Sequence, residues 1–335
     1  MADRVTLDDV ARVAGVSRAT ASRALTGSGP ASAAVQQRVR AVADQLGFSP
    51  NQAARALASN RAHAVALVIP EPNTLVLGDT FLGGVISGVS EAFRDTDYQL
   101  ILVIVRPDDE PSKASRLLRA SVDGAIIASH HFAGQFEQEM ERQPGPLVYV
   151  GRPGSVESAI YVDVDNARGG YLATRRLLAC GARRIACVAG PDDMSPVQDR
   201  LNGWKAALDE AGVVPGPLTH VPFTSSAGAK AMDRLLAQDA TIDGVFAQSD
   251  MLAAGAVRVL QEHGRKVGRD VFVVGVDDSE VARTMTPRLS SVTNPSTELA
   301  LRASRMLLQL LDDGADAAVM TPEIVEPRLV QRESA

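Results

Sequence analysis

The sequence predicts an α/β protein in which a small helical domain precedes a large core of two lobes, each built on a parallel sheet. Three observations predict this architecture. The first sixty residues place apolar side chains at helical spacing between turn residues. From residue 63 onward, short apolar runs alternate with helical stretches, a pattern typical of parallel strands covered on both faces. This region is about 270 residues long, which is too much for one sheet.

The composition indicates a soluble globular protein. The 335 residues are 45% hydrophobic and 22% charged, and no apolar run reaches the roughly 18 residues that span a bilayer. The N-terminal residues are polar and acidic, unlike a signal peptide. The two cysteines, Cys180 and Cys187, are expected to be small buried side chains in a reducing cytoplasm. Secreted and membrane proteins are therefore excluded.

The charge is divided unevenly along the chain. Residues 1–60 contain seven arginines, no lysine and four aspartates, a net charge of +3, whereas the whole chain carries −6. A small basic domain on a large acidic body is expected where only the small domain meets a polyanion.

Three short helices are expected in the basic domain. The first begins after the cap Thr6 and ends at Gly15, the second runs from Arg18 to about Leu25 after the cap Ser17, and the third ends at Gly47. The apolar positions with helical spacing are Leu7, Val10, Ala11 and Ala14, then Ala21, Ala24 and Leu25, then Val35, Val39, Val42 and Leu46.

The tight glycine turn between the first two helices matches a helix-turn-helix, whose second helix enters the major groove of DNA. That helix carries arginines and hydroxyls on its outer face and no acid. Guanidinium forks read guanine edges, and hydroxyls hold phosphate oxygens. A helical bundle with a merely solvated face is the alternative, but such a face usually mixes acids with bases. The outward residues are Ser17, Arg18, Thr20, Ser22 and Arg23.

The segment after this domain, residues 50–58, is rich in alanine and starts with Pro50, which suits a helix start. Two helical turns are too short to be stable alone in water, and Leu57 is the segment's only large apolar residue. We expect the segment to order only against another surface.

The remaining chain contains seven continuous apolar runs that predict strands. Helical stretches such as Phe81–Phe93 and Ala167–Leu178 separate them. The runs are residues 64–69, 100–105, 124–127, 147–150, 185–189, 244–247 and 271–276.

From residue 5 to about residue 332 the chain resembles the lactose-repressor/galactose-repressor family of bacterial transcription regulators. The most specific stretch is VTLDDVARVAGVSRATASRAL at 5–25, followed by GFSPNQAARAL at 47–57, which resembles the family's hinge. The other landmarks are Asp165-Asn166, Gly169-Gly170, residues 181–185, 200–204, Ser249-Asp250, residues 253–255 and 274–278.

The resemblance implies three parts. Residues 1–49 would form the helix-turn-helix domain, and 50–61 the hinge helix and linker. Residues 62–335 would form a core like a type I periplasmic binding protein. Its first lobe would take about 62–163 and 295–322, and its second about 164–294 and 323–335, with ligand bound at the carboxyl ends of the strands between them.

The resemblance further implies a homodimer that binds a pseudo-palindromic DNA operator. The residues that read bases would be Arg18, Ala19 and Arg23. The residues that contact phosphates would be Ser17, Thr20, Ser22 and Asn51. Ala53 and Leu57 would contact the minor groove, where Leu57 wedges into a base step.

A small effector, expected to be a carbohydrate, would occupy the cleft. Gly151 departs from the aspartate that many sugar-binding members carry there. The effector-binding residues implied are Arg200, Phe223 and Asp277, with Ser249 or Asp250, and Asp79, Phe81, Ser129 and His130 on facing loops.

No catalytic pattern, cofactor motif or metal site is expected. The pair His130-His131 lacks further ligands at metal spacing, and neighbouring carboxylates such as Asp277-Asp278 diverge rather than form an acid pair. The competing hypothesis is a cytoplasmic sugar-binding or sugar-modifying protein without a DNA function. The basic N-terminal domain argues against it, because such a protein has no use for one.

Overall fold

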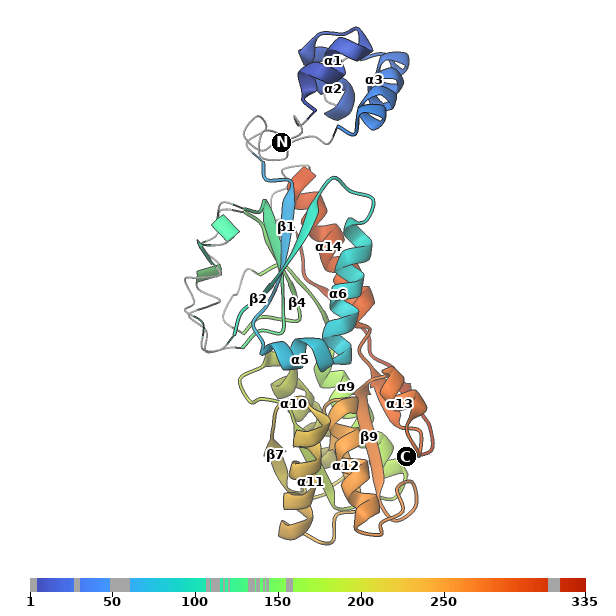
Figure 1. Cartoon of the computed structure of the whole chain (residues 1–335). Coiled ribbons are helices and arrows are strands. Elements are labelled where there is room, and N and C mark those ends of the chain that lie inside the picture. Colours follow the sequence, from blue (N-terminus) through green and yellow to red (C-terminus); the bar gives the residue numbers. More distant parts are fainter. Residues whose placement is uncertain are drawn as a thin grey trace. The chain divides into compact units, whose positions relative to one another are not determined.

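The structure is a computed structural model in which the chain divides into two compact units, Met1–Ala62 and His63–Ala335 (Figure 1). The predicted hinge residues Asn51, Ala53 and Leu57 lie outside the described residues. Those described are 5–26, 31–48, 61–106, 121–131, 145–154, 159–312 and 320–335, with positions 109, 115, 116, 118, 119, 136, 139, 140 and 142.

Three helices form the first unit: α1 (Leu7–Ala14), α2 (Arg18–Thr26) and α3 (Ala33–Leu46). A capping box starts α1, where Thr6 accepts from the Asp9 amide and Asp9 accepts from the Thr6 amide. Gly15 and Gly47 end α1 and α3 with φ of +66°, a conformation that favours glycine.

The three helices pack around one small apolar cluster that lacks aromatic residues at its centre. Every apolar position expected from helical spacing belongs to this cluster, which confirms the assigned inner faces. Its fully buried members are Val10, Ala11, Ala14, Ala21, Ala24, Val39 and Ala43.

The second unit contains two sheets, each in its own lobe. Within the described residues the first sheet has six parallel strands, so the predicted parallel sheet is confirmed. Their spatial order is β11 (Glu323–Val325), β5 (Tyr161–Val164), β4 (Leu147–Val150), β3 (Gly124–Ala128), β1 (Ala64–Ile69) and β2 (Gln99–Ile104).

Helices α6 (Thr80–Phe93) and α14 (Ser296–Asp312) lie side by side on one face of this sheet (Figure 1). They bury alternate side chains of β1, among them Val65 and Leu67, in a shared core. The opposite set, including Ala66 and Val68, packs into a second cluster on the other face. The strand is therefore apolar throughout because both of its faces are covered.

The sheet of the second lobe has six strands among the described residues, and all neighbours are parallel except β10 and β12. Helix pairs cover its two faces: α9 (Asn166–Ala179) with α10 (Ser195–Glu210), and α11 (Ser225–Gln238) with α12 (Asp250–Glu262). The spatial order of the strands is β12 (Leu329–Val330), β10 (Ser290–Thr293), β9 (Phe272–Asp277), β8 (Gly244–Ala247), β6 (Ile185–Ala189) and β7 (Leu218–His220).

The chain passes between the lobes three times: after β5, between β10 and α14, and between β11 and β12. The last crossing lies later than expected. Because Glu323–Val325 pairs with β5, this short strand belongs to the first lobe rather than to the second.

Helices α9 and α10 cross at very short range, which brings α10 and its Arg200 against the strand ends. A Cβ atom on Gly170 would lie 2.1 Å from the backbone oxygen of Arg200. We expect Gly170→Ala to lower the free energy of unfolding by roughly 1–3 kcal/mol, because overpacking forces the two backbones apart.

Urea denaturation of Gly170→Ala beside Gly83→Ala tests this expectation. Gly83 lies in α6 with no atom within 4 Å of its missing Cβ, so Gly83→Ala should stabilise by about 0.5–1 kcal/mol. Equal stability of the Gly170→Ala and wild-type proteins would contradict the close crossing.

Candidate functional site

A cleft opens between the two lobes at the carboxyl ends of the strands of both sheets. It is lined by the segments that follow β3, β4, β6, β7, β8 and β10 and by the ends of β5 and β9. Three helices also contribute: α5 (Asn73–Gly78), α6 and α10. Its lining residues are Leu75, Asp79, Phe81, Leu82, Ser129, His130, Val150, Gly151, Asp163, Met194, Pro196, Arg200, Phe223, Ser249, Asp277 and Asn294.

The cleft brings together eight of the nine effector residues expected from the sequence, although these lie up to about two hundred positions apart. Asp250 departs from the expectation. It is fully buried, and its carboxylate accepts hydrogen bonds from Ser279 and Ser291 behind the strand ends.

Arg200 projects from α10 and is only 6% exposed. Its Nε donates to Asn166 Oδ1 at 2.9 Å, and its Nη1 donates to the backbone oxygen of Gln248 at 2.7 Å. Gln248 is itself fixed, because its side-chain nitrogen donates to the Val197 carbonyl at 3.1 Å. The guanidinium is thus oriented by neutral oxygens and keeps donors for a ligand.

Asp163, at the end of β5, lines the cleft although it was not predicted from the sequence. Its Oδ2 accepts from the Arg152 amide at 3.0 Å, and its Oδ1 accepts from the Val164 amide and the Asn166 side chain. Burial raises the pKa of Asp163 to about 6. An Asp within a short strand of mixed residues gave no distinctive signal in the sequence.

Asp277 ends β9 and faces the cleft in a strained conformation, with φ of +114°. The side-chain nitrogen of Asn294, in a segment that connects the lobes, donates to Asp277 Oδ1 at 3.0 Å. Burial, reinforced by the nearby charge of Asp250, raises the pKa of Asp277 well above its usual range. Ser129 on the facing lobe also has positive φ, +59°, and such strain tends to cluster at functional sites.

His130 is buried against Tyr149, with ring centroids 5.5 Å apart in an edge-to-face arrangement. Burial lowers the pKa of His130 to about 4, so its ring is neutral at physiological pH. Gly151 lies beside it with φ of +95°. An aspartate at 151 would therefore be strained, which explains the glycine physically.

The cleft also has an apolar wall. Phe223 packs directly over Gly190, where a Cβ atom would lie 2.1 Å from the ring. Further apolar residues line the cleft: Met194 from the same lobe as Phe223, and Leu75 and Phe81 from the facing lobe. Apolar faces beside convergent polar groups are typical of small-molecule sites, and a sugar ring presents both kinds of surface.

Among the described residues, two ion pairs connect one lobe to the other at the cleft. His131, after β3, contacts Asp193 of the second lobe at 2.8 Å and Glu71 of its own lobe at 3.2 Å. Arg152, after β4, contacts Asp199 of α10 at 2.6 Å. The hydrogen bonds to Glu71 and Asp193 outweigh the burial of His131 and raise its pKa to about 9.

This charged histidine predicts a pH-dependent stability. Because the pKa of His131 in the folded protein exceeds the ordinary value of 6.5, its contribution is complete below about pH 6.5 and disappears as the pH rises through about 9. We expect His131→Gln to lower the melting temperature by about 2–4 °C at pH 6 and by nothing at pH 10.

Arg152→Gln is the matched control for this measurement. The guanidinium of Arg152 stays charged over the whole range, so the loss of its pair with Asp199 should lower the melting temperature equally at both pH values. A His131→Gln deficit that persists at pH 10 would exclude a charge-based contact between the lobes.

In the first unit, helix α2 presents the expected basic face. Arg18, Ala19 and Arg23 are exposed, and Thr20 and Ser22 are half-buried. Ser17 caps the helix, since its Oγ accepts from the Thr20 amide at 3.1 Å and contacts the Thr20 hydroxyl at 2.8 Å. Arg18 contacts Asp8 of α1 at 3.5 Å, an exposed pair that water weakens.

Neither a membrane-spanning helix nor a cluster of metal ligands occurs among the described residues. No helix is both long and apolar enough to cross a bilayer. No three histidine, cysteine or acidic side chains gather as metal ligands would.

Two family models match the chain. Residues 6–51 match the model of bacterial regulatory proteins of the lacI family. Residues 174–335 match a periplasmic binding protein-like domain. The two matches divide between the helical unit and the second unit described above.

Similar proteins match over nearly the whole chain. The HTH-type transcriptional regulator CelR of Thermobifida fusca is 38% identical over 99% of this chain and 98% of its own length. The HTH-type transcriptional regulator GalR of Escherichia coli strain K12 is 31% identical over 98% of this chain and 95% of its own.

Among solved structures, a CelR–cellobiose complex covers 99% of this chain and 100% of its own, with 36% identity and a TM-score of 0.78. The Lac repressor dimer bound to operator and the anti-inducer ONPF has a TM-score of 0.83, 24% identity and 99% coverage of both chains, which shows a shared fold. The chain belongs to the LacI family of bacterial regulatory proteins.

Proposed function

We propose that the chain is a transcriptional repressor that binds a pseudo-palindromic operator as a homodimer and changes its operator affinity when a small saccharide occupies the cleft. One observation carries this proposal. The same chain combines a helix face bearing Arg18 and Arg23 with a separate cleft built from the strand ends of two lobes. We place the protein in the cytoplasm, where its operator lies.

DNA contacts are assigned from the exposed face of α2. Arg18 and Arg23 are long donors that reach base edges, and Ala19 offers only a methyl contact. A single helix-turn-helix is too small for useful specificity, so two copies are needed on half-sites about one helical turn apart. Asn51, Ala53 and Leu57 remain assigned to the hinge by resemblance alone.

Cellobiose, a disaccharide of glucose, is the effector that we propose. CelR, a relative of this chain, was solved as a complex with cellobiose. The cleft supports the choice chemically, because Phe81 and Phe223 offer apolar faces to sugar rings while Asp163, Arg200 and Asp277 offer partners for hydroxyls.

A thermal-shift comparison of cellobiose with maltose, lactose, glucose and ribose tests the effector. A ligand at about 100 times its Kd stabilises the folded protein by about 2.7 kcal/mol, which raises the melting temperature by several degrees. We expect the largest rise with cellobiose. If cellobiose leaves the melting temperature unchanged and another sugar raises it, that sugar replaces cellobiose as the proposed effector. If no sugar raises the melting temperature, the proposal that the cleft binds a saccharide is contradicted.

A further inference from the structure

Behind the cleft, the loop that carries Asp277 is held by a network of buried polar groups. Asp277 and Asp278 are consecutive residues with φ of +114° and +50°. Two side chains in a row in this region make a turn that does not persist unless its surroundings hold it. The groups that hold this turn therefore determine the position of Asp277.

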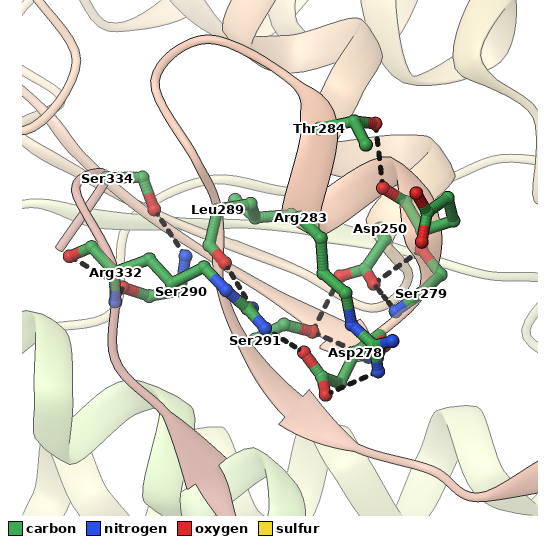
Figure 2. Close-up of polar contacts among 11 residues, drawn as sticks. Asp250, Asp278, Ser279, Arg283, Thr284, Leu289, Ser290, Ser291, Arg332 and Ser334 are labelled. Atoms are coloured by element: carbon green, nitrogen blue, oxygen red, sulfur yellow. Dashed lines mark hydrogen bonds and ion pairs between the residues drawn. The ribbon is translucent and has the colours of Figure 1, made fainter.

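The first of these groups is Asp250, at the start of α12. Its Oδ2 accepts from both the amide and the hydroxyl of Ser279 at 2.8 Å, and its Oδ1 accepts from the hydroxyl of Ser291 at 2.6 Å (Figure 2). Gly275 leaves room for this carboxylate, because a Cβ there would lie 2.4 Å from Asp250 Oδ1. Asp250 thus reaches over Gly275 of β9 to Ser279, the residue that follows the strained turn.

Ser291, in the middle of β10, links Asp250 to Asp278. While its hydroxyl donates to Asp250, its oxygen accepts the backbone amide of Asp278 at 3.0 Å. Ser291 is completely buried, so water cannot replace either bond. One small side chain therefore ties the turn to the anchored carboxylate.

Two arginines fix the side chain of Asp278 (Figure 2). Arg283 of helix α13 (Glu280–Thr284) donates to its Oδ2 at 3.0 Å and to its backbone oxygen at 2.8 Å. Arg332, which follows β12, is paired with Oδ1 and donates to the Leu289 carbonyl at 2.8 Å. With its side chain only 13% exposed, this arginine is a shielded partner.

We propose that Ser291, Asp250 and Arg332 are positioning residues for effector binding: they hold the strained Asp277–Asp278 turn so that Asp277 faces the cleft before a ligand arrives. This inference rests on the proposed function, in which Asp277 contacts the effector. It also gives Asp250 a different task from the direct contact expected of it. Such preorganisation increases affinity because the ligand does not have to order the loop.

Ser291→Ala is the sharpest test, because it removes one hydroxyl and both of its bonds. In the ligand-free protein we expect faster hydrogen–deuterium exchange in peptides that cover residues 277–279. By calorimetry we expect cellobiose to bind about fivefold to thirtyfold more weakly. Arg332→Gln, at a less buried site, should act in the same direction.

Ser304→Ala is the matched control. Ser304 is also a completely buried serine, and its hydroxyl donates to a helix carbonyl in α14 at 2.7 Å, in the other lobe. It should lower stability without changing either exchange at 277–279 or cellobiose affinity. Similar loss of affinity in both variants would reduce Ser291 to a general stability role and overturn the proposal.

A double-mutant comparison separates positioning from direct contact. If Ser291 acts through Asp277, Ser291→Ala should change cellobiose affinity little in an Asp277→Asn background, measured at millimolar sugar. The full loss in that background would overturn the proposal. If the wild-type protein does not bind cellobiose, the proposed effector falls, and unchanged exchange at 277–279 in Ser291→Ala would then overturn the positioning role separately.

Discussion

Arg200→Ala is expected to yield a protein that still binds its operator but no longer responds to the effector. The guanidinium is buried and held by Asn166 and Gln248, so its removal leaves buried oxygens of the protein and of the ligand without donors. We expect effector binding to weaken by about 1–3 kcal/mol or more. Calorimetry with cellobiose, beside operator binding without ligand, measures the two effects separately.

Arg258→Ala is the control for this substitution. Arg258 lies on α12, is 59% exposed and pairs with Glu262 four residues on, so its loss should alter neither binding reaction. An Arg200→Ala protein with wild-type affinity for the effector would remove Arg200 from the ligand site. A protein that loses operator binding and its melting transition together would point to a structural role instead.

Arg18→Ala is expected to relax base preference within each operator half-site. Arg18 is exposed at the start of α2, and a bidentate contact between arginine and guanine contributes roughly 1–3 kcal/mol of discrimination. Measured on a set of operators that differ by single bases, the affinity of Arg18→Ala should therefore no longer depend on the base at one position of each half-site. Uniform weakening on every sequence would make Arg18 a phosphate contact.

Arg12→Ala offers the comparison for Arg18. Arg12 is 75% exposed on α1 and pairs with Asp9 on the same helix, so its removal should leave base preference intact. The contact between Arg18 and Asp8 adds a second check. Asp8→Asn frees Arg18 from an acid 3.5 Å away and should strengthen operator binding modestly, by less than 1 kcal/mol.

The sequence predicted those parts of the fold that have a local signal. The seven expected strands are present. Six of them are largely buried apolar runs, as β1 and β6 are, whereas β2 lies at the edge of its sheet and is partly exposed. Strand β10 was missed because Ser290 and Ser291 are polar, although both are completely buried. Their hydroxyls can be buried because the Ala335 carbonyl and the Asp250 carboxylate accept hydrogen bonds from them, and both acceptors lie in distant segments.

Cleft residues that lie in a family motif could be predicted from the sequence. Cleft residues that only tertiary contacts bring to the site could not. Arg200 and Asp277 stand in recognisable motifs and line the cleft. Asp163 and Asn294 line it too, but they lie in short segments without a pattern. Asp250 shares a motif with Ser249 yet points behind the strand ends, because serines of β10 and of the loop after β9 surround it.

The contact of His131 with Asp193 had no sequence signal at all. From the sequence, His130 was expected on a loop that faces the cleft and His131 had no assigned role, but the two rings have opposite environments. One is buried and neutral, whereas the other lies between two acids of different lobes. The approach of the lobes contributes to this difference, because it brings Asp193 to His131.

The central claim is that the cleft and the DNA-binding face are thermodynamically coupled. The direct measurement is the Kd of the dimer for its selected operator duplex, by fluorescence anisotropy, without effector and with saturating cellobiose, in the wild-type and Arg200→Ala proteins. We expect the Kd to change by about 5–150-fold in the wild type, the usual range of such coupling, and not to change in Arg200→Ala. An operator Kd that saturating, demonstrably bound cellobiose leaves unchanged in the wild type would contradict this coupling.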